Sequence, residues 1–305
     1  MTQIEKILES TKYVVDHSKH VHINQDMLKQ FGDSIKIDES GHWLNNTPFN
    51  LEDLDKQEKA HYVLLFNTLS FSYWGDPYWE VTYPNKTYKR GSWSLTAAIL
   101  RAREEGFPIF KSDYLSAISA KDLTIILRGN RQIPLFSERL QILHEVGNTL
   151  TENYDGDYRN VIDSANNDAI NLVDRVIKDF PSFNDTAHYQ GKKIYFHKRA
   201  QALTESTHSF LGKLKNADKL TALADYILPK KLREEKILEY DDKLSYKVDN
   251  KIDLEKGSTE EVEIRANTIW AVKYIGKDPI ILNDYLWLTG REKDSPFHRT
   301  RTTGY

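Results

Sequence analysis

Residues that interrupt helices are rare along this chain, and that scarcity constrains its fold more than any other feature. The 305 residues include only 14 glycines and 9 prolines. Between these breakers, apolar side chains recur at steps of three and four residues, which is the spacing of one face of an α-helix. Glycine and proline are the residues that most strongly oppose helical backbone. The sequence therefore predicts a mainly α fold.

Eight segments carry the helical pattern clearly enough to be given bounds. In the first of them, Tyr62, Leu65 and Leu69 lie on one face of a helix. Ser258 and Glu261 have the spacing of a capping box, in which the hydroxyl and the carboxylate bind backbone N–H groups at a helix start. The predicted helices span residues 55–74, 92–103, 134–150, 158–180, 199–211, 230–238, 258–275 and 279–288.

Two short segments favour strands instead. Residues 79–90 contain Val-Thr-Tyr and Lys-Thr-Tyr-Lys on either side of Pro84-Asn85, which predicts a small β-hairpin. Residues 193–197 form a second β-prone run. No internal repeat and no Pro/Gly/Ser-rich linker marks a boundary. We expect one domain over residues 1–305, with two lobes as the alternative organisation.

Composition excludes several chemistries. The chain has no cysteine, so it can form neither a disulfide nor a thiolate metal site, and it offers no cysteine nucleophile. Its 42 Lys and Arg against 45 Asp and Glu give a formal net charge of -3, whereas general nucleic-acid binders are usually basic. The first residues carry charges throughout, and no run approaches the roughly 18 apolar residues needed to span a bilayer. We therefore expect a cytoplasmic protein.

Three histidines near the N-terminus could hold a metal ion. His17, His20 and His22 lie close together in sequence, but their spacing matches no standard site. The preferred interpretation is a solvated polar segment, and no metal site is predicted.

An aromatic helix with one polar residue is the first candidate site. Residues 66–74 read Phe-Asn-Thr-Leu-Ser-Phe-Ser-Tyr-Trp, so Asn67 lies within a nearly all-apolar run. One interpretation is a core helix whose asparagine forms a local hydrogen bond. The other is a pocket for a flat heterocycle, with rings for stacking and an amide for one polar edge. The sequence leaves both open.

Basic residues flank a short strand in residues 192–201, which is the second candidate. Such a charge run is usually a solvated face. Here, however, Lys198 and Arg199 follow Tyr195 and Phe196 at a junction between strand and helix. An anion at that point could contact both cations and the N-terminus of the helix.

Asp225 is the third candidate. It follows an apolar stretch and precedes Tyr226 and Pro229. One interpretation is an acid that caps the next helix. The other is a partly desolvated carboxylate with a raised pKa, able to activate water or to stabilise a cation.

Two further groups of charges lie in unusual surroundings. Glu261, Glu263 and Arg265 alternate with apolar residues, and positions two apart on a helix cannot face each other, so Glu263 and Arg265 need separate partners. The C-terminal tail carries basic residues among hydroxyl residues, a composition that suits phosphate and is equally common in frayed termini. The basic tail residues are His298, Arg299 and Arg301.

Seven segments, taken in order, resemble the queuosine salvage protein family, the queuosine 5′-phosphate N-glycosylase/hydrolases. They read FNTLSFSYW, GSWSLTAAILRAREEG, IPLFSERLQILHEVG, FPSFNDTAHYQGKKIYFHKRAQ, LTALADYILP, GSTEEVEIRANTIWAV and PFHRTRT. The resemblance runs from Phe66 to the C-terminus, whereas residues 1–55 match weakly. It implies a helical fold similar to that of helix-hairpin-helix DNA glycosylases. It also implies hydrolysis of the bond between ribose and a 7-deazaguanine base, which releases queuine for reinsertion into transfer RNA.

The resemblance further implies roles for the candidate residues. Asp225 would stabilise the oxocarbenium-like sugar and orient water, with Lys198 as the second catalytic group. Because a 7-deazapurine carries carbon in place of N7, the departing base must be stabilised through its other edges. The base-binding candidates are Asn67, Glu261 and Glu263 for the edges, and Phe71, Trp74 and Trp93 for the faces. The phosphate-binding candidates are Lys198, Arg199, Arg265, His298, Arg299 and Arg301.

This chemistry requires no metal and no cofactor. The expected partner is the substrate queuosine 5′-monophosphate, with queuine as the product, and neither a stable nucleic-acid complex nor membrane association is expected. The alternative function is a non-catalytic helical module that binds transfer RNA or a modified base. Such a module would show salt-sensitive RNA affinity, and the net charge of -3 counts against it.

Overall fold

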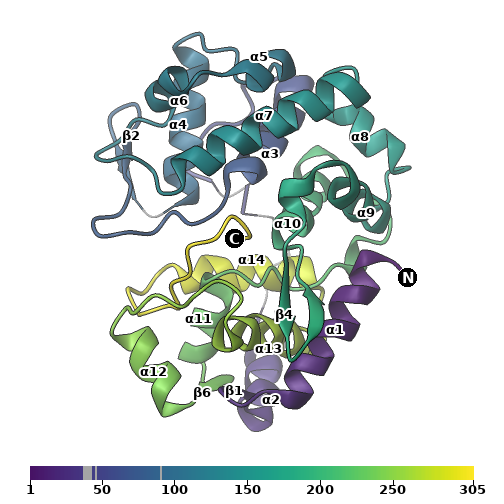
Figure 1. The fold of residues 1–305 in the computed structure, drawn as a ribbon, viewed down its shortest axis with the longest axis vertical. Coiled ribbons are helices and arrows are strands. Elements are labelled where there is room, and N and C mark those ends of the chain that lie inside the picture. The colour runs from purple at the N-terminus through teal and green to yellow at the C-terminus, as the bar shows by residue number, and fades with distance from the viewer. Residues whose placement is uncertain (37–42, 45–46, 90) are drawn as a thin grey trace.

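Helices make up most of the structure, as predicted (Figure 1). The computed structural model describes residues 1–36, 43–44, 47–89 and 91–305. None of the helices in these ranges has the length and apolar character needed to cross a membrane. The α-helices are α1 (Gln3–His17), α2 (Gln25–Ser34), α3 (Lys56–Leu69), α4 (Ser92–Glu104), α5 (Ser112–Ala117), α6 (Ala120–Ile126), α7 (Phe136–Asn153), α8 (Tyr158–Ser164), α9 (Ala169–Asp179), α10 (Lys198–Ser206), α11 (Ile227–Glu234), α12 (Asp242–Asp249), α13 (Thr259–Ile275) and α14 (Pro279–Gly290).

Short strands pair in three antiparallel two-stranded ribbons. The predicted hairpin is confirmed, with β2 (Val81–Thr82) against β3 (Thr87–Tyr88). The predicted run at residues 193–197 lies in β5 (Lys192–Tyr195), which pairs with β4 (Thr186–Tyr189). A third ribbon joins distant parts of the chain, because β1 (Val21–Ile23) pairs with β6 (Leu238–Tyr240).

The helices form two groups that meet across the middle of the molecule (Figure 1). In one group α5 packs against α7, and α3 packs against α7, α8 and α10. In the other group α13 packs against α1, α2 and α11, and α11 packs against α14. The C-terminal residues run between the two groups. A single domain and a likeness to helix-hairpin-helix DNA glycosylases stay predictions.

Two predicted helices are shorter in the structure than the sequence pattern predicts. The segment predicted as one helix over residues 158–180 is divided into α8 and α9 at Asn166 and Asn167, whose φ angles are 56° and 52°. Asparagine adopts this conformation more readily than most residues. The helix predicted to reach residue 74 ends at Leu69, and Ser72 follows with a φ of 36°. The Ser72 hydroxyl donates to the Thr302 carbonyl, so this turn packs against the C-terminal tail.

Two other helix boundaries also differ from the predictions. The helix predicted over residues 199–211 consists of α10 followed by a π-helical turn (Thr207–Leu211). π-Helical turns often accompany functional sites. The helix predicted over residues 230–238 is α11, which begins at Ile227 and ends at Glu234. Two 3₁₀ turns complete the helical structure, Pro181–Phe183 and Ala217–Lys219.

The helix that precedes the three histidines contributes to the core, whereas His17 and His22 themselves are exposed, as the interpretation of a solvated segment predicts. Thr2 and Glu5 form a capping box that starts α1. Ile7 and Val14 are fully buried on the face of α1 that packs against α13. The many charges of this segment lie on the opposite face of the helix, which is why its sequence looks polar.

The three N-terminal histidines have separate surroundings. His17 is at the end of α1, where its Nδ1 lies 2.8 Å from the Tyr13 carbonyl oxygen. His20 Nδ1 lies 2.7 Å from Asp241 Oδ2, and His22 is exposed on β1. No group of three metal-binding side chains occurs in the part of the chain that the structure describes.

We expect Ile7→Ala to destabilise the protein by about 2–5 kcal/mol, because the substitution leaves a cavity between α1 and α13. Urea unfolding followed by circular dichroism measures this loss. Glu9→Ala on the exposed face of α1 is the control and should change stability by less than about 0.5 kcal/mol. Equal effects of the two variants would mean that α1 is not part of the core.

Candidate active site

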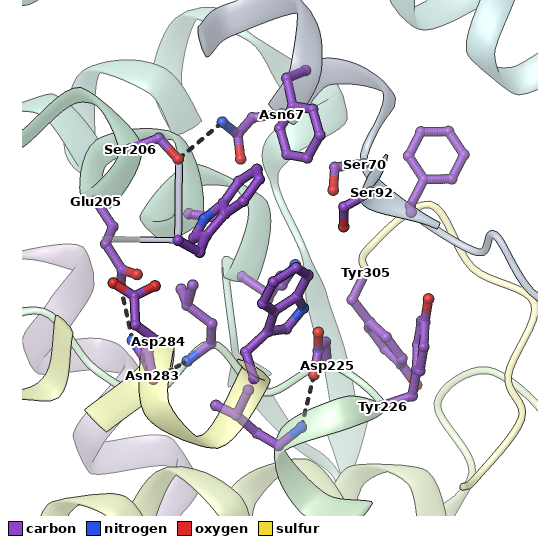
Figure 2. A pocket seen from close by; sticks show the side chains of 18 of the residues that line it. Asn67, Ser70, Ser92, Glu205, Ser206, Asp225, Tyr226, Asn283, Asp284 and Tyr305 are labelled. Atoms are coloured by element: carbon purple, nitrogen blue, oxygen red, sulfur yellow. Dashed lines mark hydrogen bonds between the residues drawn. The ribbon is translucent and has the colours of Figure 1, made fainter. Parts of the chain in front are cut away.

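A cavity opens where the two groups of helices meet (Figure 2). Its empty volume is about 670 Å³ when the open space at the mouth is included. Its walls come from the end of α3, from α10, from the start of α11, from α14 and from the last residue of the chain. Segments far apart in sequence therefore converge on one site.

Asp225 lies at this cavity and also caps a helix, so the capping interpretation is confirmed, and the catalytic one stays a prediction. Its Oδ1 accepts hydrogen bonds from the backbone N–H groups of Ile227 (2.7 Å) and Leu228 (3.0 Å) at the start of α11. The side chain is buried, and burial raises the pKa of the Asp225 carboxyl. The charge of Lys198 and the two hydrogen bonds oppose that shift. The carboxylate is thus fixed in orientation and partly desolvated.

Lys198 contributes the cation of the cavity. It is the first residue of α10, and its backbone N–H donates to Asp185 Oδ2 (3.4 Å). Burial lowers the pKa of the Lys198 ammonium group, and the negative charge of Asp225 opposes this effect. Among the described residues that line this cavity, Lys198 is the only lysine or arginine. The predicted pairing of Asp225 with Lys198 in one site is therefore present.

Two further acids and an amide gather at the other side of the cavity (Figure 2). Asn283 Nδ2 donates to Glu205 Oε2 (2.8 Å), and the Glu205 and Asp284 carboxyl groups point toward each other. Burial raises the pKa of Asp284 to about 8. Burial and the charge of Asp284 raise the pKa of Glu205 as well. The two carboxyl groups therefore retain a proton near neutral pH.

The sequence reasoning does not select this acid pair. A signal for these residues is nevertheless present in the sequence. Glu205 is an acid inside an apolar helix, and Asn283-Asp284 is a polar pair inside the apolar run of α14. Asn67, which is a predicted site residue, shows the same pattern of a polar side chain among apolar ones. Asn67 Nδ2 donates to the Val63 carbonyl (2.9 Å), so its predicted local hydrogen bond is present, and the residue also lines the cavity.

Aromatic rings form much of the wall, but only one of the three predicted rings takes part. Phe71 lines the cavity. Trp74 instead lies under Arg301, whose guanidinium is 3.7 Å from the ring centroid. Trp93 packs in the same way against Arg291 at 4.1 Å. Neither Trp74 nor Trp93 lines this cavity. The aromatic residues that do are Trp43, Phe66, Phe71, Tyr73, Tyr226, Trp287 and Tyr305.

The two predicted arginines of the core do not face the cavity. The Arg199 guanidinium donates to the carbonyl oxygens of Thr68 (2.8 Å) and Ser182. Arg265 forms a bidentate ion pair with Asp185. Both guanidinium groups are buried and bound to protein acceptors, so we do not retain Arg199 and Arg265 as phosphate ligands.

The basic residues of the C-terminal tail also bind protein groups. Arg299 pairs with Asp76 (3.1 Å), and Arg301 donates to the Trp74 carbonyl (2.7 Å). His298 Nε2 lies 3.2 Å from the Tyr305 hydroxyl, and burial lowers the pKa of His298 to about 3, which leaves it uncharged near neutral pH. None of the three lines the cavity. The tail is therefore not frayed at these positions, and the phosphate-binding role of its basic residues stays a prediction.

Glu261 and Glu263 were predicted to bind the edge of the base, but in the structure both accept hydrogen bonds from protein groups. Glu263 Oε2 accepts from the backbone N–H groups of residues 19–21, and its Oε1 accepts from the Tyr189 hydroxyl (2.8 Å). Glu261 accepts from the Gly257 N–H (3.1 Å) and from the Tyr305 hydroxyl (3.0 Å). Glu261 therefore reaches the cavity only through Tyr305, and Glu263 does not reach it.

Comparisons with known proteins identify relatives of this chain. The sequence profile of the family described as queuosine salvage protein matches residues 50–305. A protein of Sphaerobacter thermophilus is 34% identical, with 98% of this chain and 97% of that protein covered. Proteins of Dictyostelium discoideum (32%, all of both chains) and Bos taurus (31%, 97% of this chain and 98% of that one) are similar too. All three are named queuosine 5′-phosphate N-glycosylase/hydrolase.

We expect Asp284→Asn to flatten the dependence of stability on pH. Since folding raises the pKa of Asp284, its contribution to stability is full below about pH 4 and is lost as the pH rises toward about 8. The variant should therefore gain more thermal stability over the unmodified protein at about pH 8 than at about pH 5. Melting curves at both pH values test this, with the exposed Asp33→Asn as control. A gain that is equal at both pH values would contradict the expectation.

Proposed function

Because the chain belongs to the queuosine salvage protein family, we propose that it hydrolyses the N-glycosidic bond of queuosine 5′-monophosphate and releases queuine. The observation that carries this proposal is the cavity itself, which is lined by a fixed carboxylate, an ammonium group, two further acids and an amide. We include in the proposal a cytoplasmic setting and a free nucleotide, as opposed to intact RNA, as the substrate.

Asp225 is the group we assign to the sugar. Cleavage of an N-glycosidic bond passes through an oxocarbenium-like sugar, and a nearby carboxylate stabilises its positive charge. The two backbone N–H groups that bind Oδ1 hold the carboxylate in one orientation. Its Oδ2 makes no hydrogen bond with the described residues, so it is available to orient the attacking water. A partly desolvated carboxylate interacts with developing charge more strongly than an exposed one.

Glu205, Asn283 and Asp284 are the groups we assign to the base. The pyrimidinone edge of a 7-deazaguanine offers N–H donors beside a carbonyl acceptor. Two carboxyl groups that share one proton can accept from the donors and donate to an acceptor. Negative charge accumulates on the base as the bond breaks, and a proton on this pair stabilises it. Asp225 and the acid pair occupy opposite sides of the cavity, which fits a sugar at one side and a base at the other (Figure 2).

We assign the 5′-phosphate to Lys198, the cation that lines the cavity. Burial lowers the pKa of Lys198, and a bound dianion would raise it again, since a negative neighbour favours the protonated form. Ile227 and Lys230 stand where family members often carry arginine and glutamine. Lys230 Nζ donates to the Gly290 (2.8 Å) and Lys293 (2.6 Å) carbonyls, so it binds the end of α14.

We expect Asp225→Asn to leave the protein folded and to reduce queuine release by at least about 10³-fold, because the amide keeps the helix cap but carries no charge. The measurement is queuine by mass spectrometry after incubation with the monophosphate, the nucleoside or intact modified RNA. Asp241→Asn is the matched control, since Asp241 also caps a helix, through Leu244 (2.7 Å), away from the cavity. Undiminished turnover by folded Asp225→Asn would move catalysis to another residue. Tight RNA binding without base release would favour the binding-module alternative.

We expect Lys198→Met to remove the preference for the phosphorylated substrate. The ratio of kcat/KM for queuosine 5′-monophosphate to that for queuosine should fall by about 10-fold or more, because a charge-assisted contact contributes about 1.5–3 kcal/mol. Steady-state kinetics with both substrates give this ratio. Lys193→Met removes a nearby exposed cation and should leave it unchanged. If the ratio survives in Lys198→Met, the phosphate binds elsewhere.

A further inference from the structure

We propose that Arg265 is a positioning residue, which fixes the catalytic carboxylate of Asp225 relative to Lys198. The inference rests on the proposed function and adds to it a residue that does not line the cavity. Arg265 lies in the middle of α13, and its side chain is only 3% exposed. Three separate segments of the site meet at its guanidinium group.

The first of these contacts leads to Lys198. Both terminal nitrogens of Arg265 donate to the Asp185 carboxylate, with 3.1 Å between Nη1 and Oδ1. Asp185 Oδ2 in turn accepts from the Lys198 N–H, and the Asp185 carbonyl accepts from the N–H groups of Phe196 (3.0 Å) and His197 (3.1 Å). Arg265 thus anchors the residue that organises the turn into α10, from which the Lys198 side chain starts.

The second contact leads to Asp225. Arg265 Nε donates to the carbonyl oxygen of Ala224 (3.1 Å), which belongs to the peptide unit that joins Ala224 to Asp225. The Ala224 and Asp225 N–H groups bind carbonyls of the same segment, so these contacts are local, whereas the bond from Arg265 links the segment to α13. The guanidinium therefore sets the position from which the Asp225 side chain enters the cavity.

The third contact leads to the C-terminal wall of the cavity. Arg265 Nη1 lies 3.4 Å from Glu261 Oε1, and the same oxygen accepts from the Tyr305 hydroxyl. The Arg265 guanidinium also lies 4.4 Å from the centroid of the Tyr305 ring and 3.9 Å from that of Phe196. A planar group with five donors is suited to such a junction, whereas a lysine could not bind all three segments at once.

The charge of Arg265 also acts on the catalytic groups. It lowers the pKa of Asp225 and that of Lys198. Other charged or titratable groups lie near this pair. Arg199 lowers the pKa of Lys198, and Glu205 raises it. Tyr226 lies beside Asp225, and Asp185 is the ion-pair partner of Arg265. His197 lies beside Asp185, and burial lowers its pKa to about 4, so it carries no charge near neutral pH.

The test is the pH dependence of kcat and KM for queuosine 5′-monophosphate in Arg265→Gln. We expect kcat to fall by about 10²-fold, the typical consequence of a displacement of about 1 Å at a catalytic group, with a much smaller change in KM. The acid limb of the kcat profile should move to higher pH, because the cation that lowers the pKa of Asp225 is gone. A residue that only stabilises the fold would not shift this limb.

Three variants make the result decisive. Arg265→Lys keeps the charge but not the three contacts, so kcat should fall while the acid limb stays in place. Asp185→Asn should lower kcat without an upward shift of the limb. Arg101→Gln is the matched control, because Arg101 also bridges segments, through the Thr82, Ile126 and Arg128 carbonyls, but far from the cavity lining. It should keep the kcat and pH profile of the unmodified protein.

Melting curves establish which variants are folded. If Arg265→Gln does not fold, the kcat values of Arg265→Lys and Asp185→Asn test the inference in its place. Undiminished kcat in the folded variants would overturn the inference, as would the same loss in Arg101→Gln. Absence of queuine release by the unmodified protein would instead refute the proposed function.

Discussion

The ion pair between Arg265 and Asp185 is the interaction on which the rest of the site depends, because it links α13 to the turn that leads into α10 and to Lys198. Transferring two charges into the interior costs several kcal/mol per ion, and the mutual attraction offsets this only when the geometry is good. Here the pair is bidentate, and Arg265 also donates through Nε to the Ala224 carbonyl and through Nη1 to Glu261. Such a pair contributes more to a unique arrangement than to net stability.

The C-terminal tail depends on the same pair. A side-chain carbon at Gly304 would lie 2.8 Å from Asp185 Oδ1, so the backbone of the tail packs directly on the carboxylate, and only glycine fits. Tyr305 follows at once and places its ring in the cavity wall, and its carbonyl accepts from the Ser72 N–H (2.9 Å). Tyr305 is thus held by its ring, which lies in the cavity wall, and by its carbonyl, which binds Ser72. This explains why a segment with the composition of a frayed end is buried.

Sequence reasoning succeeded where a local pattern decides the structure. Helix periodicity gave most helices, and the position of Asp225 and Lys198 at helix starts after apolar runs identified two groups that do line the cavity. It was less successful where the partner of a residue is remote. The charges inside the apolar pattern of α13 show that Arg265 and Glu263 need partners. They do not show that the partner of Arg265 is Asp185, that the partners of Glu263 are the backbone amides of residues 19–21, or that neither residue binds a ligand. The break at Asn166 and the apolar face of α1 were likewise hidden by the surrounding pattern.

The division of labour between arginine and lysine follows from their chemistry. Arg139, Arg199 and Arg265 are buried, and each donates to fixed protein acceptors, such as the Phe71 carbonyl (2.5 Å) for Arg139. Guanidinium groups stay charged in such surroundings and bind several acceptors at once, which suits them to hold segments together. Lys198 is the cation that faces the cavity, and the ammonium group responds readily to its neighbours. The cation at the cavity is thus a flexible ammonium group, whereas the buried arginines hold the surrounding segments together.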